Sequence, residues 1–150
     1  MSRGILFVLI MTTGILSCSG HSADLGVKNG KLTPCPQSPN CVSSQGTDKQ
    51  HYIEPFHYEE SIREAREIIL TVIQAMKRTK IITSEDNYIR AEFVSALFRF
   101  VDDVEFDFDE SSKTIHIRSA SRVGYSDLGA NRKRIEQIRA EYMALSEAKE

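Results

Sequence analysis

The fold is decided by residues 98–122, FRFVDDVEFDFDESSKTIHIRSASR. In 98–109, apolar and charged side chains alternate along the chain. The apolar members are Phe98, Phe100, Val104, Phe106 and Phe108, and the charged members are Arg99, Asp103, Glu105, Asp107 and Asp109. In 114–122, Ile115 and Ile117 alternate with His116 and Arg118. Because side chains of a strand point to opposite faces in turn, this alternation predicts two strands with one face in the core.

A turn at Ser111 and Ser112 pairs these two strands in a single register. The pairs on the charged face are Glu110 with Lys113, Asp107 with His116 and Glu105 with Arg118, and those on the apolar face are Phe108 with Ile115 and Phe106 with Ile117. Every charged pair is then of opposite sign, and every apolar pair lies in the core. Charge and hydrophobicity agree, so the sequence predicts an antiparallel hairpin with this register.

Helices are predicted on both sides of this hairpin. Ser61 and Glu64 form a capping-box pattern at the start of a helix over 61–79, whose apolar residues recur at helical spacing. A second helix is predicted over 127–147, with Ser126 or Asp127 as its N-cap. Its apolar stripe consists of Leu128, Ile135, Ile138, Tyr142 and Leu145.

Two further segments complete the predicted fold. Residues 88–94 alternate as a strand, and residues 51–57 are expected to add an edge strand. The sequence therefore predicts an α+β domain: an antiparallel sheet of three to four strands, with two amphipathic helices packed on one face and the other face solvated.

The N-terminal stretch has the pattern of an export signal. Arg3 precedes a nearly uncharged run over 4–16, too short to span a bilayer, which needs about 20 apolar residues. The run ends in Ile15-Leu16-Ser17-Cys18, which is similar to the lipobox of bacterial lipoproteins. We expect a signal peptide over 1–17, a lipidated tether over 18–33 and one domain over 34–147. The alternatives are an ordinary secretory signal with Cys18 incidental, or an uncleaved anchor.

These features predict a location and a membrane partner. A palmitate-type lipid on Cys18 would hold the domain at the cell envelope, facing the periplasm. Ser19 follows the cysteine in place of the aspartate that often signals retention at the inner membrane, so the outer membrane is favoured.

Cysteine usage agrees with export. With Cys18 lipidated, Cys35 and Cys41 remain in the turn-rich segment Cys35-Pro36-Gln37-Ser38-Pro39-Asn40-Cys41, where an oxidising compartment favours a disulfide. The alternatives are a metal site that includes His51 or His57 and a reactive thiol pair.

Polar residues concentrate between the second strand of the hairpin and the last helix. The predicted ligand-binding residues are Arg118, Ser121, Arg122, Tyr125, Asp127, Asn131 and Arg132. Cations near a helix start oppose the helix dipole, so an anionic partner is expected nearby. That partner is either an external anion, such as a phosphate or a lipid head group, or Asp102, which would form an internal ion pair with Arg132 or Arg122.

Other function classes have less support. The net charge of −2 excludes the global basic excess of a nucleic-acid binder. The sequence contains no Gly-x-Ser-x-Gly, His-Glu-x-x-His or Walker-type motif. Its four histidines, at 21, 51, 57 and 116, have no ligand spacing, so no metal or cofactor is predicted.

Three segments resemble the domain-of-unknown-function family 1499. They are the segment from Cys35 to Ser44, Phe100-Val101-Asp102-Asp103-Val104-Glu105-Phe106, and the run from Arg118 to Gly129 continued by Asn131-Arg132-Lys133-Arg134-Ile135-Glu136. The resemblance covers 34–143. It implies an envelope or exported setting and no activity, so no catalytic residue is carried over from the family.

The sequence favours a non-catalytic binding module for an anionic small molecule, a lipid head group or an envelope protein partner. An enzyme is the alternative, either a hydrolase at the polar segment or a thiol-redox protein that uses Cys35 and Cys41. A third possibility is an assembly factor, which would expose an apolar patch.

Overall fold

Strands β7 (Val101–Asp109) and β8 (Thr114–Ser121) form the centre of the main sheet. This is a computed structural model that describes residues 25–59 and 61–148. The two strands pair in the predicted antiparallel register, with Glu105 opposite Arg118 and Phe106 opposite Ile117. The prediction of the hairpin is therefore confirmed.

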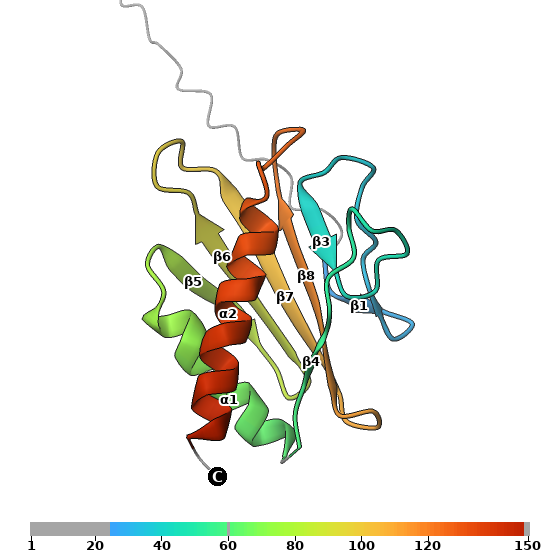
Figure 1. Cartoon of the computed structure of the whole chain (residues 1–150), viewed down its shortest axis with the longest axis vertical. Coiled ribbons are helices and arrows are strands. Elements are labelled where there is room, and N and C mark those ends of the chain that lie inside the picture. Colours follow the sequence, from blue (N-terminus) through green and yellow to red (C-terminus); the bar gives the residue numbers. More distant parts are fainter. Residues whose placement is uncertain (1–24, 60, 149–150) are drawn as a thin grey trace, which may run out of the picture.

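The main sheet has six strands, more than the three or four predicted, and every strand pair in it is antiparallel (Figure 1). The other strands are β3 (Cys41–Ser43), β4 (Phe56–His57), β5 (Thr79–Ser84) and β6 (Tyr88–Val94). Their order is β3-β8-β7-β6-β5, and β4 also pairs with β8. The α+β class and the 88–94 strand are confirmed, and β4 lies inside the predicted edge segment.

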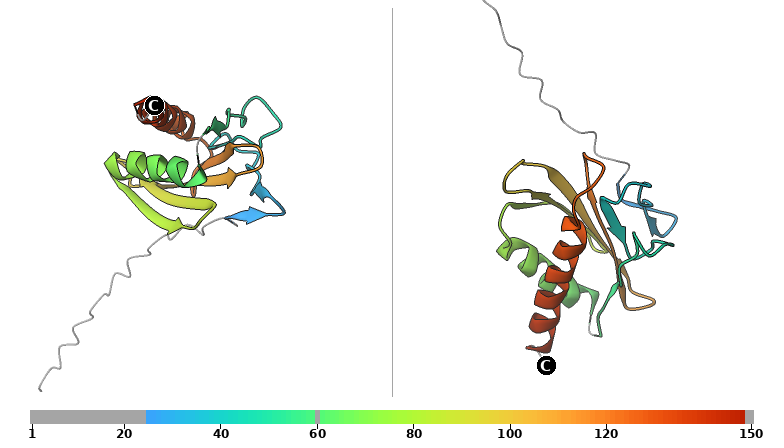
Figure 2. Two further views of the ribbon diagram at one scale, coloured as in Figure 1. Left: turned by 90° about the horizontal axis from the view of Figure 1, so that it is seen from below. Right: turned by 45° about the horizontal axis from the view of Figure 1, so that its top comes forward.

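Helices α1 (Ile62–Ala75) and α2 (Ala130–Glu147) cover one face of the sheet (Figure 2). Ser61 caps α1 through the predicted capping box with Glu64. The core lies between the helices and the sheet. Its fully buried members include Ile69 and Ile73 of α1, Ile135 and Ile138 of α2, and Phe106, Ile115 and Ile117 of the sheet. Among the described residues, neither helix has the length and apolar character needed to cross a membrane.

The opposite face of the sheet is covered as well, which corrects the prediction of a solvated face. A hairpin of β1 (Val27–Lys28) and β2 (Lys31–Leu32) lies there with the loop over 33–40 (Figure 2). Leu32 is buried, and the backbone N–H of Gly26 donates to Oε1 of Glu105 at 2.7 Å. Residues 25–33, assigned from sequence to the tether, are therefore folded onto the domain. The predicted signal peptide and Cys18 lie outside the described residues.

Four apolar residues expected in the core are exposed. Phe98 and Phe100 are 69% and 48% exposed, because the chain turns at 95–100 before β7 begins, and Ser95 N–H donates to the Phe100 carbonyl across that turn. Leu128 is 97% exposed, because α2 begins only at Ala130 with Gly129 as its N-cap, in place of the predicted Ser126 or Asp127. Leu145, at the other end of the predicted stripe, is 38% exposed.

The first helix is shorter than the predicted 61–79. It ends at Ala75, and Arg78 adopts a left-handed backbone with φ of 60° that turns the chain into β5. Strand β5 carries a bulge between Ile81 and Thr83, which breaks the two-residue alternation. Because its apolar and polar residues do not alternate regularly, β5 could not be predicted as a strand from the sequence.

Candidate functional site

Asn131, at the start of α2, joins three parts of the domain. Its side chain is fully buried, and its Nδ2 donates to the Asn40 carbonyl at 3.0 Å, to Ser121 Oγ at 3.0 Å and to Asp127 Oδ2 at 2.7 Å. Its Oδ1 accepts from Ser119 Oγ at 2.6 Å. Asn131 therefore ties the disulfide loop, β8 and α2 together, a structural role.

Asp102 forms an internal ion pair, as predicted, but with a different arginine. Its Oδ2 lies 2.5 Å from Nη2 of Arg134, whereas the sequence analysis named Arg132 or Arg122. Arg132 instead donates from Nη2 to the carbonyls of Gln50 and Tyr52, at 3.0 and 2.7 Å. Position 134 lies one helical turn beyond Ala130, so its side chain reaches back over the sheet to Asp102, while Arg132 reaches outward to the loop.

The remaining two arginines lie on the other face of the sheet, in a group that we call the ionic cluster: Arg90, Glu92, Asp103, Glu105, Arg118 and Arg122. Arg118 Nη1 lies 3.1 Å from Glu105 Oε2, and both side chains are buried. Arg122 lies 2.7 Å from Asp103 and also contacts Glu92. The cluster holds three cations and three carboxylates, so its formal charge is balanced.

Arg122 in the ionic cluster and Tyr88 beside it both have shifted pKa values. The Asp103 carboxylate, together with Glu92, raises the pKa of the Arg122 guanidinium above its ordinary value. Burial, reinforced by the neighbouring Glu105, raises the pKa of Tyr88, whose hydroxyl donates to Glu105 Oε1 at 2.7 Å. Arg122 therefore stays charged and Tyr88 stays neutral at any physiological pH.

A cavity of about 420 Å³, here called the N-terminal cavity, opens beside this cluster. It is lined by Leu25, Thr33, Pro34, Pro36, Ser38, Asn40, Asp103, Arg118, Ala120, Ser121, Arg122, Val123 and Gly124. The structure thus brings three of the seven predicted ligand-binding residues, Arg118, Ser121 and Arg122, to one cavity. It places Tyr125, Asp127, Asn131 and Arg132 outside the lining.

Arg118 is the unusual member of this lining. It is only 2% exposed, and its Nε atom is buried without a hydrogen-bond partner among the described residues. An unsatisfied buried donor of this kind costs about 1–3 kcal/mol, and a hydrogen-bond acceptor that reaches Nε would recover part of that cost. Arg118 is therefore the residue of the cavity that most needs a ligand or an ordered water.

The disulfide loop forms one wall of the N-terminal cavity. Cys35 and Cys41 are bonded, with their Cα atoms 5.6 Å apart, so the predicted disulfide is present. His51 supports the loop, because its Nε2 lies 3.2 Å from the Ser38 carbonyl and its Nδ1 lies 2.9 Å from Asp48 Oδ2. The hydrogen bond to Asp48 raises the pKa of His51 above its ordinary value.

The sequence analysis considered His51 only as a metal ligand. In the described part of the chain, no three His, Cys, Asp or Glu side chains gather as a metal site would require.

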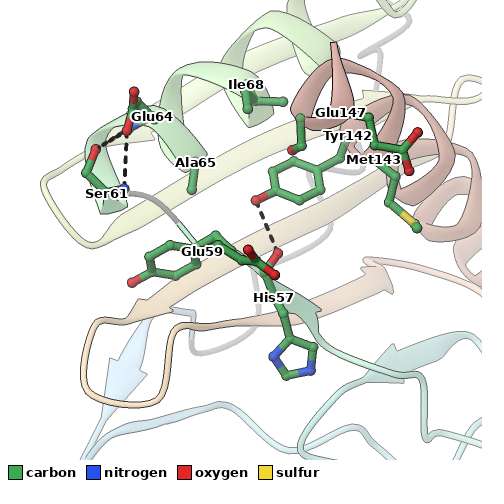
Figure 3. Close-up of a pocket in the computed structure, with 11 residues that line it drawn as sticks. His57, Glu59, Ser61, Glu64, Ala65, Ile68, Tyr142, Met143 and Glu147 are labelled. Carbon is green, nitrogen blue, oxygen red and sulfur yellow. Dashed lines mark hydrogen bonds between the residues drawn. The ribbon is translucent and has the colours of Figure 1, made fainter. Parts of the chain in front are cut away.

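A second cavity, of about 300 Å³, lies between the start of α1 and the end of α2 (Figure 3). The sequence analysis did not anticipate it. Three of its polar side chains have structural partners: Ser61 and Glu64 form the helix cap, and the Tyr142 hydroxyl donates to the His57 carbonyl at 3.3 Å. The His57 ring points away from Tyr142 (Figure 3). The carboxylates of Glu59 and Glu147 also line this cavity, beside the apolar side chains of Ala65, Ile68 and Met143.

A comparison with curated proteins finds no match to this chain. A protein-family model matches residues 31–142, which include both strands of the central hairpin, the disulfide loop and most of α2. Its description is a protein of unknown function. Because that match covers most of the chain, the chain belongs to the DUF1499 family.

Proposed function

We propose that this chain is a lipid-anchored protein of the cell envelope whose domain is a non-catalytic binding module. The lipobox-like Ile15-Leu16-Ser17-Cys18 supports the anchor. The Cys35–Cys41 disulfide supports an oxidising compartment, because such bonds are rare in the cytosol. The outer membrane is the favoured location, since Ser19 is not an inner-membrane retention residue.

The N-terminal cavity is the binding site in this proposal. The observation that carries it is the buried Nε of Arg118, a charged donor without a partner, in a residue that lines a cavity of about 420 Å³. Arg122 and Ser121 line the same cavity and provide a second guanidinium and a hydroxyl. Guanidinium groups bind phosphate and carboxylate oxygens through directed hydrogen bonds.

The balanced charge of the ionic cluster narrows the class of ligand. A ligand with a large negative charge would compete with Glu105 for Arg118 and with Asp103 for Arg122. A zwitterionic phosphate keeps the balance, because its phosphate meets the arginines while its ammonium group meets Asp103. We therefore expect a zwitterionic phospholipid head group, such as phosphoethanolamine, rather than free inorganic phosphate.

The hydrolase alternative has weaker support. The Ser121 hydroxyl oxygen accepts a hydrogen bond from Asn131 Nδ2. An amide cannot remove a proton, so this contact does not turn Ser121 into a nucleophile. The thiol-redox alternative needs an accessible thiolate, but Cys41 is 1% exposed and bonded to Cys35.

Lipidation is tested by metabolic labelling with palmitate in a bacterial host that expresses the full chain. We expect label in the wild type and none in Cys18→Ala. The double variant Cys35→Ser/Cys41→Ser is the matched control, because it removes the other two cysteines and should keep the label. Label that persists in Cys18→Ala, or is absent from the wild type, contradicts the anchor.

Ligand binding is tested by titrating the full chain with a water-soluble short-chain phosphatidylethanolamine and, separately, with inorganic phosphate. We expect the amide NMR signals of 120–124 to move with the first ligand, and Arg122→Gln to weaken its binding by at least about tenfold. Arg132→Gln is the matched control, because Arg132 belongs to the same segment but lies outside the cavity. Ala120→Val fills the cavity without changing charge and should also weaken binding. Equal loss in Arg122→Gln and Arg132→Gln would contradict this site.

A further inference from the structure

Six exposed apolar residues lie on two neighbouring loops, and together we call them the apolar tip. They are Leu97, Phe98 and Phe100 between β6 and β7, and Val123, Tyr125 and Leu128 between β8 and α2. Leu128, Leu97 and Tyr125 are the most exposed, at 97%, 78% and 76%. Apolar groups that gather in this way on a domain surface mark an interaction site.

Strand pairing places both loops at one end of the sheet (Figure 1). Val94 pairs with Val101, so the first loop closes there, and Asp102 pairs with Ser121 at the start of the second. The Arg122 N–H donates to the Val101 carbonyl at 3.0 Å, which joins the roots of the two loops. The tip is therefore one surface built from two loops.

The backbone holds these side chains outward. Leu128 has a left-handed backbone with φ of 53°, a conformation that leucine rarely adopts, and its N–H donates to Ser126 Oγ. Arg99, which stands between Phe98 and Phe100 in the sequence, is also left-handed, with φ of 59°. The rings of Phe98 and Phe100 stack on each other with centroids 5.6 Å apart. Unfavourable conformations that expose leucine and phenylalanine are typical of functional surfaces.

We propose that the apolar tip inserts into the interface of the bilayer that holds the lipid on Cys18, an inference that rests on the proposed lipidation. Only seven Cα–Cα steps separate Cys18 from Leu25, a span of at most about 25 Å. Leu25 lines the N-terminal cavity with Val123 and Gly124, and it also lines a cavity with Thr83 and Glu85 near the β5–β6 turn, so the chain leaves the domain on the covered face of the sheet. A lipid on Cys18 therefore keeps the domain, and with it the tip, close to the bilayer.

The exposed charges favour the same orientation. Lys77, Arg78, Arg99 and Lys133 are exposed around the tip. The opposite end of the domain, where the β5–β6 and β7–β8 turns and the end of α2 lie, exposes Glu59, Glu85, Asp86, Glu110 and Glu147 against two cations, Arg63 and Lys113. Anionic lipids attract the basic end and repel the acidic end. Aromatic rings and leucines surrounded by cations also match the composition of interfacial membrane-binding surfaces.

The chain contains no tryptophan, so a single introduced indole reports on one position. The full lipidated chain is reconstituted in vesicles of phosphatidylethanolamine and phosphatidylglycerol, with or without brominated acyl chains. The variants are Phe98→Trp and Tyr125→Trp in the tip, with Met143→Trp as the control, because Met143 is 52% exposed near the far end of α2. We expect blue-shifted emission and loss of about half the intensity in brominated vesicles for both tip variants, and no such change for Met143→Trp.

The outcomes separate this inference from the proposed function. If the chain floats with the vesicles but the tip variants are quenched no more than Met143→Trp, the apolar tip does not enter the bilayer, and the lipid anchor stands. If the tip indoles are shielded from aqueous iodide yet untouched by brominated lipid, a protein surface covers the tip and the inference is overturned. If Cys18 carries no lipid, the proposed anchor fails, and the tip proposal fails with it.

Discussion

Glu105 and Arg118 face each other directly across β7 and β8, with Oε2 of one 3.1 Å from Nη1 of the other and both side chains buried. Tyr88 and the Gly26 backbone also donate to the Glu105 carboxylate, so this group ties the N-terminal hairpin to the sheet. Breaking a buried pair from one side leaves an uncompensated charge. We therefore expect Glu105→Gln to lower the free energy of unfolding by about 3 kcal/mol in urea denaturation.

Two comparisons make this prediction specific. The double variant Glu105→Leu/Arg118→Leu removes both charges and should be more stable than Glu105→Gln. Glu136→Gln removes the exposed partner of Arg139, at 2.9 Å, and should change the unfolding free energy by no more than about 0.5 kcal/mol. Equal effects of Glu105→Gln and Glu136→Gln would show that burial adds nothing to the pair.

Replacement of Asn131, which lies outside the lining of the N-terminal cavity, should destabilise the domain. Asn131→Leu leaves the Asn40 carbonyl and the Ser119 hydroxyl without their buried partner. We expect a loss of about 3 kcal/mol in the free energy of unfolding, measured in urea. Gln137→Leu, on the exposed side of the same helix, is the control and should be close to neutral. A stable Asn131→Leu variant would mean that this network does not hold α2 to the disulfide loop.

The support that His51 gives to the disulfide loop should weaken as pH rises. The hydrogen bond to Asp48 raises the pKa of His51 above 6.5 and lowers that of Asp48 below 3.8. The contribution of His51 is then fully present below pH 6.5 and is lost as pH rises through its raised pKa. That of Asp48 is present above pH 3.8 and is lost as pH falls through its lowered pKa. The contact is therefore strongest between these two values.

Histidine NMR titration measures this directly, and amide exchange in 35–41, corrected for the intrinsic rate, should be faster at pH 8 than at pH 6. Asp48→Asn should bring the pKa of His51 back toward its ordinary value. A His51 pKa at or below 6.5 in the wild type contradicts the assigned contact.

The disulfide should contribute local stability. Closing a loop of this length restricts the unfolded chain by about 2 kcal/mol in the loop-entropy model. We expect Cys35→Ser/Cys41→Ser to lose about that much unfolding free energy while α1 and α2 keep their circular dichroism signal. The buried Cys41 should resist reduction by glutathione in the native state. Rapid reduction of the Cys35–Cys41 disulfide in the folded protein would support the thiol-redox alternative.

The central hairpin could be predicted from sequence because two independent constraints, charge and hydrophobicity, select the same register. Glu105 with Arg118 and Phe106 with Ile117 satisfy both at once. The partner of Asp102 could not be predicted in the same way. Arg132 and Arg134 both stand near the start of α2, and only the position of that helix over the sheet decides that Arg134 reaches the carboxylate.

The second face of the sheet was misassigned for a physical reason. Alternating charged residues normally mark a solvated face, but here they pair among themselves and are buried under the hairpin of β1 and β2. That hairpin has two residues in each strand, too short for a periodic signal. Phe98 and Phe100 continue the alternating pattern of β7, although the chain turns before that strand begins. The pattern therefore predicted that both side chains lie in the core, and sequence analysis missed the apolar tip.

The hairpin over the sheet also sets an order of assembly. Gly26 bonds to Glu105 and Asn40 bonds to Gly124 and Asn131, so the first described part of the chain docks on residues synthesised about 80–90 positions later. A nascent chain therefore carries its N-terminal cover without a place to pack until β7, β8 and the start of α2 exist. Once these elements exist, the charged face of the sheet stays open to water and to chaperones until the N-terminal segment docks. The hairpin of β1 and β2 is thus made before the strands that it covers and docks after them.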